Sequence, residues 1–179
     1  IFDFEKQAGQ RDFIFLSLLR AMPSVSWISI GTPQGNFYGA QRAGDGGFRL
    51  VSIAWDQASG QGAQTTYKYR VKGAEAEYES AESAATDFKS IDQGWYKRAV
   101  AEGCDEVRCS PERGAGWNLV SHFPDGDRAG ISTSMPLVAN TKFGGVINVA
   151  IELELVSKFL SYQMIGEGGT VIVIDREGH

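Results

Sequence analysis

Two large aromatic side chains lie next to each other in the middle of the chain, within the segment that begins at Phe88 and ends at Tyr96. Trp95 and Tyr96 combine flat apolar rings with an N–H and an O–H group, which suits them either to line a small-molecule pocket or to pack in a core. The surrounding residues predict a loop that runs into a short helix, where adjacent side chains point about 100° apart. One of the two can therefore bind a ligand while the other packs.

The chain offers little that could hold a metal ion. Cys104 and Cys109 are the only cysteines and do not form a C-x-x-C motif, and with only 2 histidines present a structural zinc site is disfavoured. Asp125 and Asp127 resemble part of a calcium loop whose other ligands are missing, so a plain turn is the favoured interpretation. His122, on a predicted strand, faces the side opposite its predecessor and fits a surface or core role. We predict no metal and no cofactor.

Composition and missing motifs exclude several classes of function. The chain has no nucleophile elbow, P-loop, dinucleotide fingerprint or H-E-x-x-H motif, so catalysis is not predicted for it, although a catalytic output domain can lie outside it. A formal net charge of -5 and the lack of Lys or Arg runs argue against a nucleic-acid partner. A length of 179 residues with 42% hydrophobic content predicts one domain with attachments. No apolar run reaches the roughly 20 residues that span a bilayer, and no signal-peptide pattern is present.

The first predicted element is a long helix over residues 2–22. Phe13, Leu16 and Leu19 recur at three- and four-residue spacing, with further apolar residues one position round the helix. Pro23 disfavours the α conformation at the residue before it and predicts the end of the helix. Two interpretations stay open: a core or dimer-packing helix, and an arm that connects the domain to another part of the protein.

A group of strands follows the helix. Residues 27–30, 37–42, 48–55 and 65–71 predict an antiparallel meander, with Pro and Gly in the turns between its first strands. Residues 75–85 are acidic and alanine-rich, which predicts a solvated helix or loop. A short helix is predicted over residues 95–101, with Asp92 or Gln93 as its cap and Gly103 at its end.

A second group of strands is predicted over residues 117–123, 130–138 and 145–152. A helix over residues 153–163 comes next, and the β-branched run at 170–174 predicts a buried strand. The last residues resemble a turn that opens a hairpin, and the chain begins at Ile1, so we expect it to be part of something longer. The order of helix, strands, short helix, strands and helix indicates an α+β fold with an antiparallel sheet.

These segments, in this order, resemble the double Cache family, the extracytoplasmic PAS-like sensor domains of bacterial receptors. The resemblance rests on the long helix, the strand with Trp27, the pair Trp95-Tyr96, the run Gly130-Ile131-Ser132-Thr133-Ser134-Met135-Pro136-Leu137, the run Gly144-Gly145-Val146-Ile147 and the closing residues 169–178. It implies a long N-terminal connecting helix over residues 1–23 and a membrane-distal module over residues 24–152, built as a PAS-like antiparallel sheet with flanking helices. Residues 153–179 would then hold a linking helix and the first strand of a truncated membrane-proximal module.

The resemblance also implies a pocket. The family pattern there is Tyr, Arg five positions later, and Trp and Tyr at positions seven and eight, which fall here on Phe88, Gln93, Trp95 and Tyr96. Both of the last aromatics are kept, but the arginine is replaced by glutamine. An arginine suits a carboxylate through charge-assisted hydrogen bonds, whereas Gln93 offers only a neutral amide.

Other pocket positions also depart from the family. Ser121 stands where the family has a tyrosine, and Ala150 stands where it has an aspartate that could pair with an ammonium group. Thr133, on the strand over residues 130–138, completes the predicted ligand-binding set. Without the arginine and the aspartate, a free α-amino acid is disfavoured as the ligand, and a neutral or weakly polar small molecule is favoured.

The function implied by the resemblance is that of an extracytoplasmic sensor, in which a small molecule binds between the sheet and the segment 88–96. The parent protein would be a membrane-anchored bacterial receptor, with this part in the periplasm and a homodimer formed through the N-terminal helix. In that oxidising compartment Cys104 and Cys109 would form a disulfide. The alternative is a dimerisation or protein-interaction module that binds no ligand, because an unused pocket would lose its charged residues in the same way.

Overall fold

The computed structural model describes residues 7–73, 75–105, 108–122, 128–139, 142–162 and 174. In chain order the elements are α1 (Ala8–Ala21), β1 (Trp27–Gly31), β2 (Phe37–Arg42), β3 (Phe48–Asp56), β4 (Gln61–Lys72), β5 (Glu75–Thr86), the 3-10 helix η1 (Ser90–Asp92), α2 (Gly94–Gly103), α3 (Pro111–Gly114), β6 (Gly116–His122), β7 (Ala129–Ala139), β8 (Lys142–Glu152) and α4 (Leu153–Ser161). Apart from position 174, the strand predicted at 170–174 lies outside the described residues.

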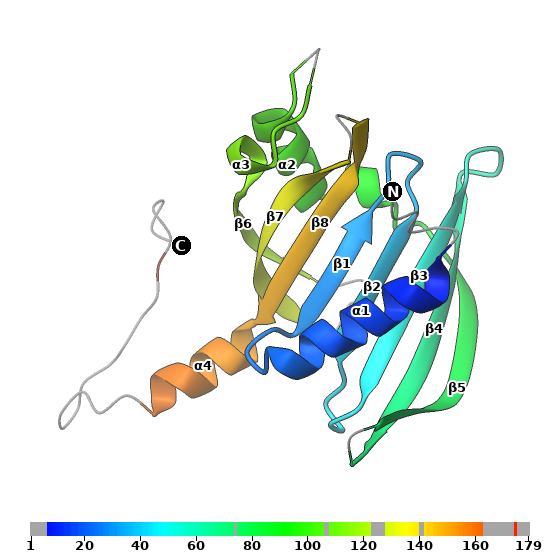
Figure 1. Cartoon of the computed structure of the whole chain (residues 1–179), viewed down its shortest axis with the longest axis vertical. Coiled ribbons are helices and arrows are strands. Elements are labelled where there is room, and N and C mark those ends of the chain that lie inside the picture. Colours follow the sequence, from blue (N-terminus) through cyan, green and yellow to red (C-terminus); the bar gives the residue numbers. More distant parts are fainter. Residues whose placement is uncertain are drawn as a thin grey trace.

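The strands of the described chain form one antiparallel sheet of eight, in the order β5-β4-β3-β2-β1-β8-β7-β6. The first strand therefore lies near the centre, hydrogen-bonded to β2 on one side and to β8 on the other. This pairing sets Ser29 of β1 opposite Asn148 of β8, although the two are distant in sequence. The arrangement of sheet and helices (Figure 1) confirms the predicted α+β fold with an N-terminal helix and an antiparallel sheet.

Different helices cover the two faces of the sheet. Side chains alternate along a strand, so Ile28 and Ile30 of β1 share one face, where they join the cluster of Phe15 and Leu19 from α1. Trp27 points to the other face and belongs to the cluster that contains the aromatic residues of α2. Figure 1 shows α1 lying across the front of the sheet, with α2 and α3 close to the upper ends of β6, β7 and β8.

The side chains that α1 buries differ from the set that the apolar spacing predicts. Its buried residues are Arg11, Phe15 and Leu19, one at every fourth position, whereas the side chain of Phe13 is 71% exposed. Residues four apart lie on one face of a helix, whereas position 13 lies on the opposite side of the helix. The prediction that Phe13 belongs to the packed face is therefore wrong. The Arg11 guanidinium lies 4.1 Å from the centroid of the Tyr38 ring, which allows a charged residue to be buried there.

Strand β5 corrects the prediction of a solvated helix or loop over residues 75–85. The segment forms a 12-residue strand at the edge of the sheet, paired with β4. Alanine and glutamate disfavour strands, but an edge strand can leave glutamates in water and pair them across the strands with basic residues. The ion pairs join Lys68 to Glu82, Arg70 to Glu79 and Lys72 to Glu77.

Helix α4 follows β8 directly and confirms the helix predicted after the last strand of the sheet, as far as residue 161. Its exposed residues Glu154 and Lys158 form an ion pair one turn apart. Among the helices in the described ranges, none is long and apolar enough to cross a membrane. The module boundaries at residues 23 and 152 stay predictions.

Candidate ligand-binding site

The segment 88–96 packs on the face of the sheet opposite α1. Ser90 is fully buried, and its hydroxyl donates a hydrogen bond of 2.8 Å to the backbone carbonyl of Asn36, between β1 and β2. Ser90 and Trp95 meet β1 at Gly31, where an added Cβ would lie 2.8 Å from the Ser90 Cβ and 2.9 Å from the Trp95 ring. Glycine at position 31 therefore permits this close approach of the segment to the sheet.

Helix α2 begins without a capping side chain. Gln93 occupies the N-cap position, and its backbone carbonyl accepts hydrogen bonds from the N–H groups of Tyr96 (3.1 Å) and Lys97 (3.0 Å). The side-chain amide of Gln93 instead donates to the carbonyl of Lys89 at 3.2 Å. The predicted cap position is thus confirmed at Gln93, but the side-chain cap expected from Asp92 or Gln93 is not formed, because the amide of Gln93 bonds back across η1.

The aromatic residues of the segment are buried. Trp95 and Tyr96 are 8% and 6% exposed, and their ring centroids lie 5.7 Å apart in an edge-on contact. Tyr96 also meets Phe143 edge-on, and Phe88 meets Phe37 in the same way with centroids 5.1 Å apart. Burial raises the pKa of Tyr96 to about 12, because the charged phenolate is disfavoured away from water. In this structure both Trp95 and Tyr96 are core residues that cover the sheet.

Polar side chains lie on the same face of the sheet. Ser29, Ser132 and Asn148 are all buried, and the amide of Asn118 donates to the Ser132 hydroxyl (2.9 Å) and to the side-chain oxygen of Asn148 (3.4 Å). The Ser29 hydroxyl makes no hydrogen bond within the described part of the chain, and the residue is 1% exposed. Leaving a buried hydroxyl without a partner costs roughly 1–3 kcal/mol. Ser29 therefore places an unsatisfied hydroxyl on the α2 face of the sheet.

Arg98 connects α2 to β6 and β7. Its Nε donates to the side-chain oxygen of Asn118 at 2.7 Å, and its Nη2 donates to the carbonyls of Gly116 (2.8 Å) and Ser134 (2.9 Å). The Ser134 hydroxyl donates in turn to the backbone carbonyl of Trp95 at 2.9 Å. Any shift of α2 must therefore carry β6 and β7 along or break these bonds.

Several polar residues of the site are missing from the predicted set, namely Ser29, Arg98, Asn118 and Asn148. Two of them carry a sequence signal. Asn148 lies two positions before Ala150 and so shares its face, and asparagine is depleted in strands. Arg98 lies three positions after Trp95 and so falls on the same side of the helix. Ser29 has no local signal, because what surrounds it depends on the pairing of β1 with the distant β8.

The structure brings four of the predicted ligand-binding residues to one place. Ala150 is fully buried in the same core cluster as Trp95 and Tyr96. Phe88 is half-buried and packs against that cluster. Gln93, half-exposed, belongs to the same segment but directs its amide towards the Lys89 carbonyl.

Thr133 does not join this cluster. Its neighbours Ser132 and Ser134 are buried towards α2, so alternation along β7 places Thr133 on the opposite face of the sheet. Its hydroxyl donates to the carbonyl of Gly116 at 3.0 Å. Ser121 lies in β6, and its side chain lies outside the described residues. The ligand-binding roles assigned to the predicted set stay predictions.

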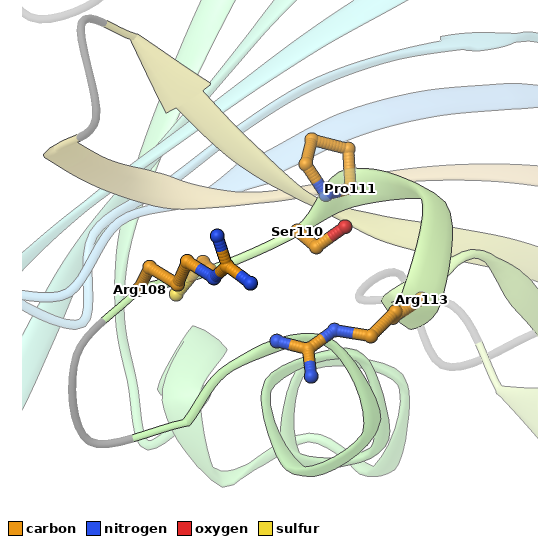
Figure 2. A pocket seen from close by; sticks show the side chains of 5 residues that line it. Arg108, Ser110, Pro111 and Arg113 are labelled. Atoms are coloured by element: carbon orange, nitrogen blue, oxygen red, sulfur yellow. The ribbon is translucent and has the colours of Figure 1, made fainter.

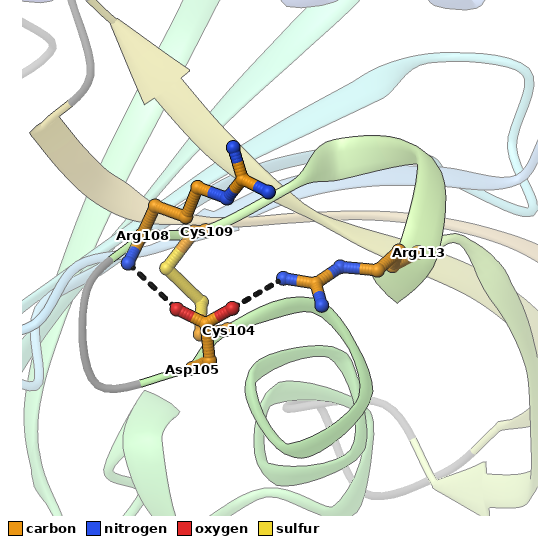
Figure 3. Close-up of a disulfide and its surroundings, with 5 residues drawn as sticks. All are labelled: Cys104, Asp105, Arg108, Cys109 and Arg113. Atoms are coloured by element: carbon orange, nitrogen blue, oxygen red, sulfur yellow. Dashed lines mark hydrogen bonds and ion pairs between the residues drawn. A yellow bond between two sulfur atoms is a disulfide. The ribbon is translucent and has the colours of Figure 1, made fainter.

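The predicted disulfide is present between Cys104 and Cys109. Cys104 is the residue that ends α2, so the bond closes a small loop on the end of the helix that carries Trp95. Figure 3 shows Asp105 inside this loop, where its carboxylate accepts hydrogen bonds from the backbone N–H of Arg108 and from the guanidinium of Arg113, both at 2.9 Å. The loop is thus held by a covalent bond and by a charged pair.

The described residues contain no group of three or more His, Cys, Asp or Glu side chains placed to hold a metal ion. The turn predicted at Asp125 and Asp127 lies outside the described residues, as does the side chain of His122.

Comparison with solved structures places the fold. The ligand-binding domain of the Campylobacter jejuni chemoreceptor Tlp3, in complex with 4-methylisoleucine, matches with a TM-score of 0.50 and 12% identity over 84% of this chain and 41% of that one. The extracellular domain of the putative histidine kinase vpHK1S-Z8 matches with a TM-score of 0.45 and 13% identity, over 91% and 48% of the two chains. A domain of a putative sensory box/GGDEF family protein from Vibrio parahaemolyticus gives a TM-score of 0.44 and 13% identity, over 90% and 50%.

The chain spans half or less of the length of each of these structures. No protein-family model matches it, and no curated protein matches its sequence. At 12% identity the likeness to the chemoreceptor domain concerns the fold. On that likeness, together with its antiparallel sheet and N-terminal helix, the chain has a PAS/Cache-like α+β fold.

Proposed function

We propose that this chain is the small-molecule-binding part of an extracytoplasmic sensor in a bacterial receptor. Its ligand binds on the α2 face of the sheet, between β1, β8 and β7 and the segment 88–96. The observation that carries the proposal is the buried hydroxyl of Ser29, which has no hydrogen-bond partner in the described chain and lies opposite Asn148. A ligand with a hydrogen-bonding group at this point would bond the Ser29 hydroxyl, and this bond would offset the free energy that burying the hydroxyl costs.

The residues around Ser29 indicate the class of ligand. Trp95, Tyr96 and Phe88 supply apolar surface, while Gln93 and Ala150 are neutral where the resembling family carries an arginine and an aspartate. The guanidinium of Arg98 on α2 is already hydrogen-bonded to side-chain and backbone oxygens of β6 and β7, so it is not free to bind a carboxylate. The proposed ligand is therefore neutral or weakly polar, rather than a free α-amino acid.

The chemoreceptor domain with this fold was solved with 4-methylisoleucine, an amino acid with an apolar side chain. Such a molecule carries an ammonium and a carboxylate at neutral pH. Positions 93 and 150 of this chain offer no opposite charge to either group. What the two proteins would share under this proposal is the place of binding and the apolar contacts, and they would differ in how the polar end is held.

Binding is coupled to movement in this proposal. Trp95 and Tyr96 belong to the layer that covers this face of the sheet, and Ser29 is itself 1% exposed, so a ligand that reaches Ser29 has to displace part of that layer. Arg98 ties the same helix to β6 and β7, and the displacement therefore passes into that end of the sheet. A ligand that binds the displaced form better shifts the population towards it, which is how a sensor reports to the rest of its receptor.

The disulfide supports an extracytoplasmic location, because such bonds persist in oxidising compartments and are rare in the cytosol. We place the chain in the periplasm, in a membrane-anchored receptor whose catalytic output, if it has one, belongs to another domain. No catalytic role is proposed for the chain itself.

The test is a thermal-shift screen against amines, amino acids, carboxylates, purines and sugars. A ligand should raise the melting temperature by mass action, and Trp95→Ala should abolish the rise. Ser29→Ala should raise the melting temperature of the free protein by about 2–12 °C, since an unpartnered hydroxyl is removed, and should reduce the shift caused by the ligand.

The matched control is Ser52→Ala on β3, which makes the same change on the α1 face of the sheet and should leave the ligand-induced shift unchanged. A screen without any shift would overturn the proposal. So would a ligand whose effect is the same in Ser29→Ala and in the unmodified chain.

A second candidate function is dimerisation without a ligand, and the exposed side of α1 favours it. Large apolar side chains are exposed on this helix at Phe13, Ile14 and Leu18, and directly after it at Met22. Apolar groups gathered on one helix commonly mark an interaction surface. Analytical ultracentrifugation should then show a concentration-dependent dimer that Phe13→Glu dissociates, whereas Val71→Glu on β4 leaves it intact. A dimer together with an empty ligand screen would favour this function, and a monomer at all concentrations would exclude it.

A further inference from the structure

A cleft of about 390 Å³ lies beside the disulfide, on the side of the molecule formed by the loop after α2 and by α3. It is lined by Arg108, Cys109, Ser110, Pro111 and Arg113. Figure 2 shows the guanidinium groups of the two arginines extending from opposite sides into the same space, with the Ser110 hydroxyl close by. The cleft therefore presents two positive charges and one hydroxyl.

The backbone that carries the two arginines is held in place by a disulfide and by packing. Arg108 is next to Cys109, whose disulfide to Cys104 fixes the loop. Arg113 lies in α3, a short turn that begins at a proline and packs through its last residue against α2 and β7. The backbone N–H of Ser110 donates to the carbonyl of Gly103 at 2.7 Å, which ties the floor of the cleft to the end of α2.

The charges of the cleft are unbalanced. Asp105 accepts a hydrogen bond from the Arg113 guanidinium at 2.9 Å and forms an ion pair with it. The guanidinium of Arg108 makes no hydrogen bond or ion pair within the described part of the chain, and its bonds to Asp105 come from its backbone N–H and carbonyl. Both charged residues that line the cleft are therefore arginines, and the Arg108 guanidinium is the one that is unpaired within the described chain.

We propose that this cleft binds a small oxyanion, at a site separate from the one on the α2 face of the sheet. Guanidinium groups match the paired oxygens of phosphate and carboxylate groups, and two of them converging on one space repel each other until an anion lies between them. Arg108 supplies the unpaired donor, Arg113 the second cation, and Ser110 a neutral donor. A cleft of this volume leaves room for an organic substituent on the anion.

The experiment is an NMR titration of the isotope-labelled chain, disulfide intact, with inorganic phosphate at constant ionic strength. Phosphate should shift the amide signals of residues 108–113 with a dissociation constant on the order of 1–10 mM, as expected for an exposed site. A second titration with acetate tests whether the cleft binds carboxylate groups as well as phosphate groups. Shifts with acetate at the same residues extend the site to carboxylates, and shifts with phosphate alone restrict it to phosphate groups.

Arg108→Gln should raise the dissociation constant about fivefold or more, because it removes the unpaired donor. Arg70→Gln is the control for the loss of one surface charge, since Arg70 is 73% exposed on β4 and does not line the cleft. It should leave the constant unchanged, and the spectra themselves report whether each variant is folded. The proposal is overturned if sodium chloride shifts the same signals equally, if neither anion shifts them, or if Arg70→Gln weakens binding as much as Arg108→Gln.

Discussion

Gly31→Ala tests how the segment 88–96 is seated on the sheet. The added methyl group would lie 2.8 Å from the Cβ of Ser90 and 2.9 Å from the ring of Trp95, both closer than atoms in contact can be. Gly31 does not have a positive φ, so an alanine there meets no backbone strain and the effect is one of packing alone. The segment must move outward or the strand must shift.

The expected magnitude follows from these contacts. Overpacking a core lowers the free energy of unfolding by roughly 1–3 kcal/mol. Replacing a glycine raises it by about 0.4–1 kcal/mol, because the unfolded chain becomes more restricted. A net loss of about 1–2 kcal/mol should lower the melting temperature by roughly 2–8 °C for a chain of this length. The same displacement of Trp95 should weaken any ligand-induced thermal shift.

The assay is thermal unfolding followed by circular dichroism, with Gly9→Ala as the matched control. Gly9 lies in α1 with nothing within 4 Å of an added Cβ, so its replacement should be neutral or slightly stabilising. Trp95→Phe removes the outer ring that the new methyl group would strike, and Gly31→Ala should cost less in that background. The reasoning is refuted if Gly31→Ala lowers the melting temperature no more than Gly9→Ala does, or if its cost is the same with Phe at position 95.

Two further predictions concern Tyr96 and the disulfide. The pKa of Tyr96 is raised from 10.0 to about 12, so the unfolded chain loses this proton first and stability falls as the pH rises from about 10 through 12. Tyr96→Phe should remove that loss and also the latest step of a tyrosine absorbance titration; an unchanged alkaline melting curve and titration would contradict the assignment. Replacing Cys104 and Cys109 by serine opens a loop whose ends are 5 positions apart, and should cost about 2 kcal/mol in the free energy of unfolding. Urea denaturation measures this loss, and a midpoint equal to that of the unmodified chain would show that the bond does not constrain the loop.

The parts of the fold that sequence reasoning predicted well have strong local signals. The strands before residue 56 are rich in apolar and β-branched residues, with rough alternation over 48–55, and turns that contain Gly or Pro separate them, so these features act over a few residues. The segment 75–85 was predicted wrongly because Ala and Glu favour a helix locally, whereas the pairing of Glu82 and Glu79 with basic residues of β4 depends on the neighbouring strand. In α1, Phe13 carries an apolar signal yet points to solvent.

In the candidate site, too, some residues have a signal in the sequence and others are placed only by the pairing of distant strands. Trp95, Tyr96 and Ala150, which the resemblance assigned to one pocket, belong to one buried core cluster, and their ligand-binding role stays a prediction. The polar residues on the same face of the sheet were missed because Ser29 lies opposite Asn148 only through the pairing of β1 with β8, which are the first and last strands in chain order. Such contacts between distant segments have no period or spacing in the sequence that would predict them.

The glutamates of β5 also bear on how copies of the chain meet. β5 is hydrogen-bonded to β4 and ends the sheet on that side, so a 12-residue strand presents backbone donors and acceptors that a second chain could pair with. Glu75, Glu77, Glu79 and Glu82 line this edge with charged side chains, and a second strand that paired with it would have to remove water from them. The acidic strand thereby protects the protein from edge-to-edge aggregation and leaves other surfaces, such as the exposed side of α1, for any specific association.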